Sequence, residues 1–399
     1  MANKEQSEVM IQTCIRFFSL AIAASIRFVR PFHLCRLSPA RVVAVAQAVL
    51  LLCASHNPAR AECAQPRPCA TAPVDLGTLG GDWARVLSIS DDGAAAVGMS
   101  ALAGTIPGDY HAFRWTSVGM VDLTPVPKRM SSEAAGVSGD GKVIVGSQQI
   151  ALGAPRTTVW TSAGMSQFAT KSDSYAVGAS RDGSIIVGGA NIGDPSDRVL
   201  HAYRWSSAGE GKDLGTFGGS YGHAAATSSD GSVIVGTATT SKGAYRAFRW
   251  TDAGMVDLGT LGGHIASATG VSADGTVVVG LSNNTNNSDT HAFLWTSAGM
   301  VDLATLGGGS SVANGVSSDG SVVVGLSQIA GSSDYHAFRW SKIAGMQDLN
   351  IVLTKAGIDM TGITLLEAVA ISGNGEYIVG SATFPGKQSS RAFIVRFVD

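Results

Sequence analysis

Short apolar runs recur from Ala84 to Phe397, and glycine, serine and aspartate separate them. The stretch Ala268–Gly280 is representative, because small and β-branched residues stand on both sides of a Ser-Ala-Asp-Gly segment. Apolar residues at the three- and four-residue spacing of an amphipathic helix do not appear in these runs. The pattern therefore predicts short strands that are joined by tight turns.

The runs belong to a sequence repeat. Six tryptophans stand at intervals of 45 residues, at Trp115, Trp160, Trp205, Trp250, Trp295 and Trp340. Seven copies of the repeat align, each with a Ser-x-Asp/Asn-Gly turn, a β-branched run, a second glycine and a strand of the His-Ala-Phe-Arg-Trp kind. The turns end at Gly93, Gly141, Gly183, Gly231, Gly275, Gly320 and Gly375. A fixed period of this length is typical of an architecture with one supersecondary unit per copy.

Each copy provides four strand-length segments, which is the content of one propeller blade. We therefore predict an all-β, seven-bladed β-propeller with four-stranded blades over residues 74–399. The first segment, Val74–Leu76, resembles an outer strand without a blade before it, and the last copy ends at a third strand. We expect the N-terminal strand to pair with the last blade and close the ring, which would remove two exposed sheet edges.

These motifs resemble the bacterial HAF extracellular-repeat family, which is named for the tripeptide found here at His111, His291 and His336. The accompanying segment Asp-Leu-Gly-Thr-Leu-Gly-Gly stands at Asp75–Gly81 and Asp257–Gly263. The resemblance implies a β-propeller-like exported repeat protein, and some members resemble autotransporter passengers. It implies no catalytic residues. Because the sequence ends directly after the last repeat, we expect no translocating domain.

The N-terminal segment indicates export. Val42–Ala54 is an apolar core of signal-peptide length after Arg36 and Arg41, and Ala59-Arg60-Ala61 matches a cleavage site. We expect residues 1–61 to be a signal peptide with a long n-region and residues 62–73 to be an N-terminal tail. A retained anchor or a start at Met10 are alternatives. The expected location is secreted, at the cell surface or in the periplasm, with no stable membrane span after cleavage.

Charge and cysteine content limit the partners. Removal of residues 1–61 takes away seven of the 28 basic and two of the 30 acidic side chains, which leaves a net charge of about −7. With no basic stripe, we expect no nucleic-acid partner. Cys63 and Cys69 remain, and they form either one disulfide or two free thiols.

The HAF histidines do not predict a metal site. At the aligned position of the HAF histidine, the seven copies carry either histidine or arginine, and arginine cannot coordinate a metal. We expect a structural role, such as a bond to a turn or to the aspartate of an outer strand. His223 and His264 lie outside the repeat pattern, but no third ligand is evident. We therefore expect no metal and no cofactor.

The blade-to-blade loops are the best guide to function, because they diverge between copies while the turns do not. Three of them lose the Thr-Leu-Gly-Gly motif, at Thr124–Glu133, Thr170–Tyr175 and Asn350–Glu367. In the last of these we expect a short helical turn around Leu353–Gly357. Trp83 is the one tryptophan outside the 45-residue series. The candidate ligand-binding residues of this sector are Trp83, Arg85, Lys128, Arg129, Glu133, Lys171, Asp173 and Tyr175.

We therefore predict an adhesin-like binding module, expected to be a monomer, that meets a glycan or protein at the cell surface through its variable loops. Alternatively, these loops diverge only because their copies do not need the Thr-Leu-Gly-Gly motif, and the sector has no binding function. An envelope glycan hydrolase or lyase at the central channel is the alternative function. It would need converging carboxylates, whereas the inner strands offer mostly Ala, Gly, Ser and Val. A purely structural surface repeat is a third possibility.

Overall fold

The computed structural model describes residues 69–104, 109–124, 130–150, 155–168, 173–193, 199–285 and 289–398. These residues belong to one compact unit. The described residues contain many strands and a single helix, so the expected all-β class is confirmed. The expected signal peptide and Cys63 lie outside the described residues.

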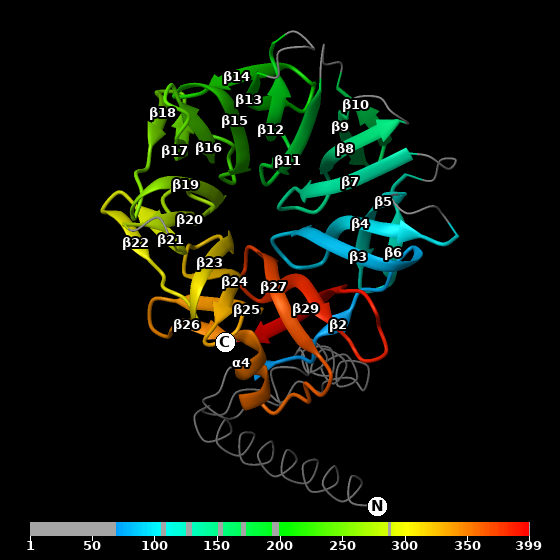
Figure 1. Ribbon diagram of the computed structural model, residues 1–399. Helices are drawn as coiled ribbons and strands as arrows, with labels where there is room; N and C mark the ends of the chain where they lie inside the picture. Colours follow the sequence, from blue (N-terminus) through cyan, green and yellow to red (C-terminus); the bar gives the residue numbers. More distant parts are fainter. Residues whose placement is uncertain are drawn as a thin grey trace, which may run out of the picture. The chain divides into compact units, whose positions relative to one another are not determined.

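Consecutive strands form antiparallel sets of four, and Figure 1 shows the sets arranged around a common axis. The first three sets are β3 (Gly80–Ile89), β4 (Ala96–Leu102), β5 (Tyr110–Thr116) and β6 (Gly119–Asp122); β7 (Met130–Val137), β8 (Ile144–Ile150), β9 (Arg156–Thr161) and β10 (Gly164–Gln167); and β11 (Ser174–Ala179), β12 (Ile185–Asn191), β13 (Leu200–Ser206) and β14 (Gly211–Gly215).

The next three sets follow the same order. They are β15 (Gly218–Thr227), β16 (Ile234–Thr240), β17 (Tyr245–Thr251) and β18 (Gly254–Asp257); β19 (Gly262–Val271), β20 (Val278–Asn284), β21 (Thr290–Thr296) and β22 (Gly299–Asp302); and β23 (Gly307–Val316), β24 (Val322–Ile329), β25 (Tyr335–Ser341) and β26 (Gly345–Asp348). The strand-length segments of the sequence repeat thus correspond to the observed strands.

The last set combines the two ends of the repeat region. β27 (Thr364–Ile371), β28 (Tyr377–Thr383) and β29 (Arg391–Val398) are followed by β2 (Val74–Asp75), which pairs antiparallel with β29. β1 (Cys69–Ala70) pairs with the far end of β29. The sequence predicted the pairing of Val74 and Asp75 with the last copy, but it placed Cys69 and Ala70 in a tail outside the sheets.

The Ser-x-Asp/Asn-Gly turns are linked to one another by backbone hydrogen bonds. In each bond, the backbone N–H of the x residue, or of the Asp or Asn that follows it, donates to the backbone carbonyl of the x residue in another copy. The N···O distances are between 2.9 and 3.0 Å. The bonds join Asp91 to Gly139, Asp140 to Arg181, Arg181 to Ser229, Ser229 to Ala273, Ala273 to Ser318, Ser318 to Gly373, and Asn374 back to Asp91. This series returns to the residue from which it starts.

The hydrophobic core lies between neighbouring sets. One cluster joins Val235 and Leu258 of the fourth set to Ala268 and Phe293 of the fifth. The phenylalanine of the third strand is fully buried in five sets, at Phe113, Phe248, Phe293, Phe338 and Phe393. The HAF tripeptide therefore places an aromatic ring between adjacent sheets, where its burial stabilises the stacking of the repeats.

The helix α4 (Leu349–Lys355) lies between β26 and β27. Asp348 is its N-cap and accepts a hydrogen bond from the backbone N–H of Asn350, while Leu349 and Leu353 are buried in the core. The expected helical turn exists but begins before Leu353, because the aspartate that ends β26 also caps the first turn.

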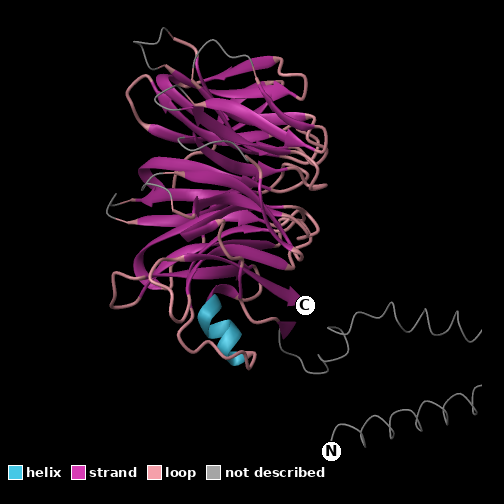
Figure 2. Cartoon of the chain, turned by 90° about the vertical axis from the view of Figure 1, so that its right-hand side faces the viewer, coloured by secondary structure: helices cyan, strands magenta, loops and turns pink. Residues whose placement is uncertain are grey.

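Connections gather at two opposite faces of the strands, as the side view in Figure 2 shows. We call the side with the Ser-x-Asp/Asn-Gly turns the turn face. The side with the connections between sets and between second and third strands is the loop face. We call the first strand of each set its inner strand. Thr-Leu/Phe-Gly-Gly segments lead into inner strands on the loop face, where Thr78 Oγ1 donates a hydrogen bond to the carbonyl of Gly81 at 2.8 Å.

Candidate functional site on the loop face

Trp83 lies near the start of β3 and packs against Tyr110 at the start of β5. The ring centroids are 5.9 Å apart and the rings are inclined by 53°. Both side chains are half-buried. Ser100 fixes this end of β3, since its hydroxyl accepts a hydrogen bond from the N–H of Leu79 and donates one to the carbonyl of Trp83. An aromatic pair is thus held at the edge of the loop face.

Arg85 and Glu133 lie beside this pair, on the inner strands of the first two sets. Burial raises the pKa of Glu133, and the positive charge of the exposed Arg85 acts in the opposite direction. Burial also raises the pKa of the Tyr110 hydroxyl, and the charge of Glu133 adds to that effect. Trp83, Tyr110, Arg85 and Glu133 therefore form one group, which we call the Trp83 cluster.

Arg85 and Glu133 occupy equivalent positions in their repeats. In each set, the residue after the second glycine of the repeat lies on the second strand and is paired with one residue of the inner strand. In the first set, for example, Met99 is paired with Arg85. The seven residues in this column are Arg85, Glu133, Tyr175, His223, Ser267, Val312 and Glu367. Five of these seven side chains are charged or aromatic, whereas most other residues of the inner strands are small or aliphatic.

Tyr175 contacts a different group from the one that the sequence indicated. Its ring stacks on His223 of the next set, with centroids 5.7 Å apart and an interplanar angle of 25°. Tyr221 and Tyr245 pack edge to face beside them at 5.7 Å. The sequence predicts Tyr175 in the same sector as Trp83 and places His223 outside that sector. The structure places both in a second aromatic group, which is formed by side chains from neighbouring copies of the repeat.

Burial controls the titration of this second group. It lowers the pKa of His223 to about 4, so the imidazole is neutral at physiological pH. Burial and the neighbouring Tyr221 raise the pKa of the Tyr175 hydroxyl. The group is therefore uncharged at neutral pH, which distinguishes it from the charged Trp83 cluster.

The remaining predicted residues contribute less to the geometry. Asp173 is half-buried, and its backbone carbonyl accepts a hydrogen bond from the N–H of Asn191 at 2.9 Å. Lys128, Arg129 and Lys171 lie outside the described residues. The structure thus brings Trp83, Arg85 and Glu133 together and adds Tyr110, which does not stand out in the sequence because its position follows the repeat.

The HAF histidines have the structural role that their column predicts. Nδ1 of His111 lies 2.9 Å from Oδ2 of Asp122 on the adjacent outer strand, and His336 is paired in the same way with Asp348 at 2.6 Å. Arg391 replaces the histidine in the last set and pairs with Asp75. The described ranges contain no group of three or more His, Cys, Asp or Glu side chains that could hold a metal ion.

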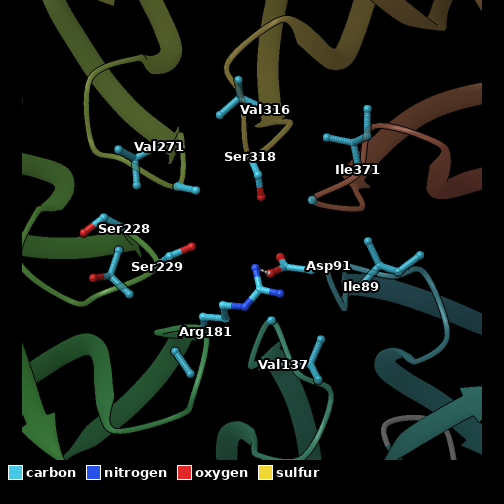
Figure 3. Close-up of a pocket in the computed structure, with 15 residues that line it drawn as sticks. Ile89, Asp91, Val137, Arg181, Ser228, Ser229, Val271, Val316, Ser318 and Ile371 are labelled. Carbon is cyan, nitrogen blue, oxygen red and sulfur yellow. Dashed lines mark ion pairs between the residues drawn. The ribbon is translucent and has the colours of Figure 1, made fainter.

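A second polar feature lies on the turn face, where a cavity of about 120 Å³ opens at the centre of the ring of turns. Figure 3 shows the Arg181 guanidinium extending toward Asp91, and the ion pair between them has an N···O distance of 3.0 Å. Gly139 lies between the two, and an added Cβ there would come within 2.4 Å of Asp91 Oδ2. Sequence reasoning missed this pair, although opposite charges at the x position of two copies could have indicated it.

In the described part of the chain, no helix is both long and apolar enough to span a bilayer.

No protein-family model and no curated protein matches this sequence. Among solved structures, the chain is similar to TolB from Acinetobacter baumannii, with 16% identity and a TM-score of 0.44 over 65% of this chain and 62% of that chain. It therefore spans less than two thirds of that TolB. A putative TolB from Agrobacterium tumefaciens gives 14% identity and a TM-score of 0.44, over 77% of this chain and 99% of that one.

The β-propeller domain of the Trilobed protease from Pyrococcus furiosus, described as having an open velcro topology, gives 9% identity and a TM-score of 0.49. The match covers 78% of this chain and 95% of that domain. Because these identities and TM-scores are low, we draw no functional argument from the similarities.

Proposed function

We propose that the protein is an exported seven-bladed β-propeller of the HAF-repeat type whose loop face binds a glycan or protein in the cell envelope. The sets of strands would be its blades, closed by β2 on β29. Three observations support closure: the β2–β29 pairing, the series of turn hydrogen bonds that returns to Asp91, and the ion pair between Asp75 and Arg391.

The Trp83 cluster carries the binding proposal. Half-buried Trp83 and Tyr110 offer aromatic surface, and Arg85 and Glu133 supply a donor and an acceptor beside it. Rigid aromatic side chains next to an arginine are the usual composition of a binding hot spot. A glycan suits this composition well, because sugar rings stack on aromatic faces while their hydroxyls bond to charged groups.

The proposal is tested by binding of the full-length exported protein to a glycan array and to bacterial cells, with Tyr110→Ala and Tyr335→Ala as matched variants. Both tyrosines precede the His-Ala-Phe tripeptide, but only Tyr110 belongs to the Trp83 cluster. We expect Tyr110→Ala to weaken binding by about tenfold or more and Tyr335→Ala to leave it unchanged. Equal effects of the two substitutions would contradict the proposal.

The raised pKa of Glu133 favours one alternative, an envelope glycan hydrolase or lyase at the loop-face end of the central channel. A carboxyl group whose pKa is raised by burial is better suited to act as a general acid than an exposed one. Release of soluble products from envelope glycans, lost in Glu133→Gln, would favour that alternative over a binding module.

A further inference from the structure

The ring of Trp250, one of the regularly spaced tryptophans, lies beside two cations. The Arg204 guanidinium lies 5.8 Å from the centroid of this indole, and the Lys212 ammonium lies 4.8 Å from it. Arg204 on β13 is directly opposite Lys212 on β14. Two opposed residues of the third set thus place cations over the tryptophan of the fourth, an arrangement that is favourable for an aromatic face.

The junction between the last and first sets differs from this arrangement. Ile394 on β29 is directly opposite Val74 on β2, in the positions that Arg204 and Lys212 hold in the third set. The tryptophan of the following set is here Trp115. The two residues at these positions carry no charge, so the junction provides aliphatic side chains where the third set provides cations.

A cavity of about 420 Å³ occupies this junction on the turn face, and we call it the seam pocket. Its walls include Trp115, Tyr377, Ile394 and Val74. The outer strand is only two residues long here, and β1 and β2 are separate, whereas most other sets have a continuous outer strand of four residues. The volume is in the range of pockets that hold small molecules.

The charges around the seam pocket favour a cation. Arg396 lines the pocket, but its guanidinium binds Glu376 at 2.8 and 3.0 Å and lies 5.2 Å from the Tyr377 ring centroid. Asp92 also lines it. Its Oδ1 accepts hydrogen bonds from the Ser90 hydroxyl at 2.7 Å and the Ala94 N–H at 2.9 Å.

The same two hydrogen bonds lower the pKa of Asp92, so its carboxylate is ionised at neutral pH. Its charge is not cancelled by Arg396, whose own charge is paired with Glu376. The seam pocket therefore combines an aromatic wall with a negative charge, which is the combination that recognises alkylammonium and guanidinium groups.

We propose that the seam pocket binds an organic cation, an alkylammonium or guanidinium group, which lies on Trp115 with Asp92 as its counter-charge. The cation takes the place that Arg204 and Lys212 hold at Trp250. It is supplied either by a small free amine or by a lysine or arginine side chain of a partner protein. The site is separate from the Trp83 cluster and lies on the opposite face.

Calorimetric titration of the full-length protein tests the site, with choline, butylammonium and a neutral isostere of choline, 3,3-dimethylbutanol. We expect saturable binding of both cations and at least tenfold weaker binding of the alcohol. A peptide with a single lysine, compared with its acetylated form, distinguishes the sources. Tighter binding of the lysine peptide than of butylammonium would assign the site to a protein partner, and the reverse order to a free amine.

Two variants and one control connect binding to these residues. Asp92→Asn removes the charge but should keep the turn, because Asn374 makes the equivalent bonds to Ser372 and Glu376 in the last copy. We expect it to weaken cation binding at least fivefold, whereas Asp274→Asn in the fifth copy should have no effect. Ile394→Arg introduces the arginine that the third set carries at this position, Arg204. The new side chain should cover Trp115 and abolish binding.

Unchanged binding in both Asp92→Asn and Ile394→Arg would overturn the proposal, as would equal binding of choline and its neutral isostere or no saturable binding of any cation. Thermal unfolding of each variant verifies that it is folded. If Ile394→Arg does not fold, Asp92→Asn and the neutral isostere still decide the result.

Discussion

Asp75, in the first strand of the repeat region, forms an ion pair with Arg391, in the last strand, at 3.3 Å. Six other sets offer the same two positions, and four of them pair a histidine with an aspartate there. The contact that stabilises a single repeat elsewhere thus joins the two ends of the repeat region in the last set.

Asp75→Asn should therefore destabilise the whole domain. The Arg391 side chain is only 9% exposed, so loss of its partner leaves a largely buried charge, at an expected cost of about 1–2 kcal/mol in the free energy of unfolding. The matched control is Asp257→Asn, which breaks a longer and more exposed pair with Arg246 at 3.7 Å within one repeat. Urea unfolding should show a smaller loss for the control, and equal losses would contradict a special role for the contact that joins the two ends of the repeat region.

Asp348→Ala should cost more than the same substitution in a neighbouring repeat. Asp348 binds His336 and also caps α4, whereas Asp302 binds His291 and the N–H of Ala304 without a helix. We expect about 2 kcal/mol for Asp348→Ala and about half of that for Asp302→Ala. Thermal unfolding of the two variants measures the difference, and the absence of a difference would show that the cap contributes little.

His223 should make stability depend on pH. Its pKa is about 4 in the folded protein and near the ordinary 6.5 when unfolded, so the unfolded chain binds more protons between these values. The contribution of His223 is fully present above pH 6.5 and is lost as the pH falls toward 4. Since the ring is still partly accessible, we expect a loss of about 1–2 kcal/mol.

Denaturant unfolding across this pH range measures the loss. His223→Phe keeps an aromatic ring against Tyr175 and should flatten the dependence on pH. An identical pH profile in wild type and variant would show that His223 does not titrate in this way.

Gly139→Ala should disturb the centre of the turn face. The new Cβ would lie 2.4 Å from Asp91 Oδ2 and 2.9 Å from Arg181 Cγ, so the ion pair would have to move. We expect a cost of about 1–2 kcal/mol. Gly309→Ala is a suitable control, because its nearest contact would be an ordinary 3.4 Å from Asp289. Similar unfolding free energies for the two variants would contradict the expected clash.

Local features of the fold could be predicted because each is repeated along the sequence. The turns, the four strands per copy, the histidine–aspartate contact and the pairing of Val74 and Asp75 all follow from alignment of the copies with one another. The pairing of Cys69 and Ala70 could not be predicted, because neither residue belongs to the repeat and their strand is only two residues long.

Contacts between copies were harder to predict. The alignment shows that Tyr175 and His223 share a column, but their stacking depends on how one inner strand faces the next. The Asp91–Arg181 pair passes over Gly139 of the intervening copy, so no comparison of adjacent repeats reveals it. The seam pocket is lined by residues from both ends of the repeat region, among them Val74 and Ile394, and alignment of the copies does not show that they enclose a cavity.

The most direct test of the account is glycan-array and cell binding of the full-length protein beside Trp83→Ala. Trp83 is the tryptophan outside the 45-residue series, and its half-buried ring packs against Tyr110. We predict saturable binding that falls by about tenfold or more in Trp83→Ala while the unfolding free energy changes little. Unaltered binding in a folded Trp83→Ala variant would contradict the assignment of the loop face as the binding surface.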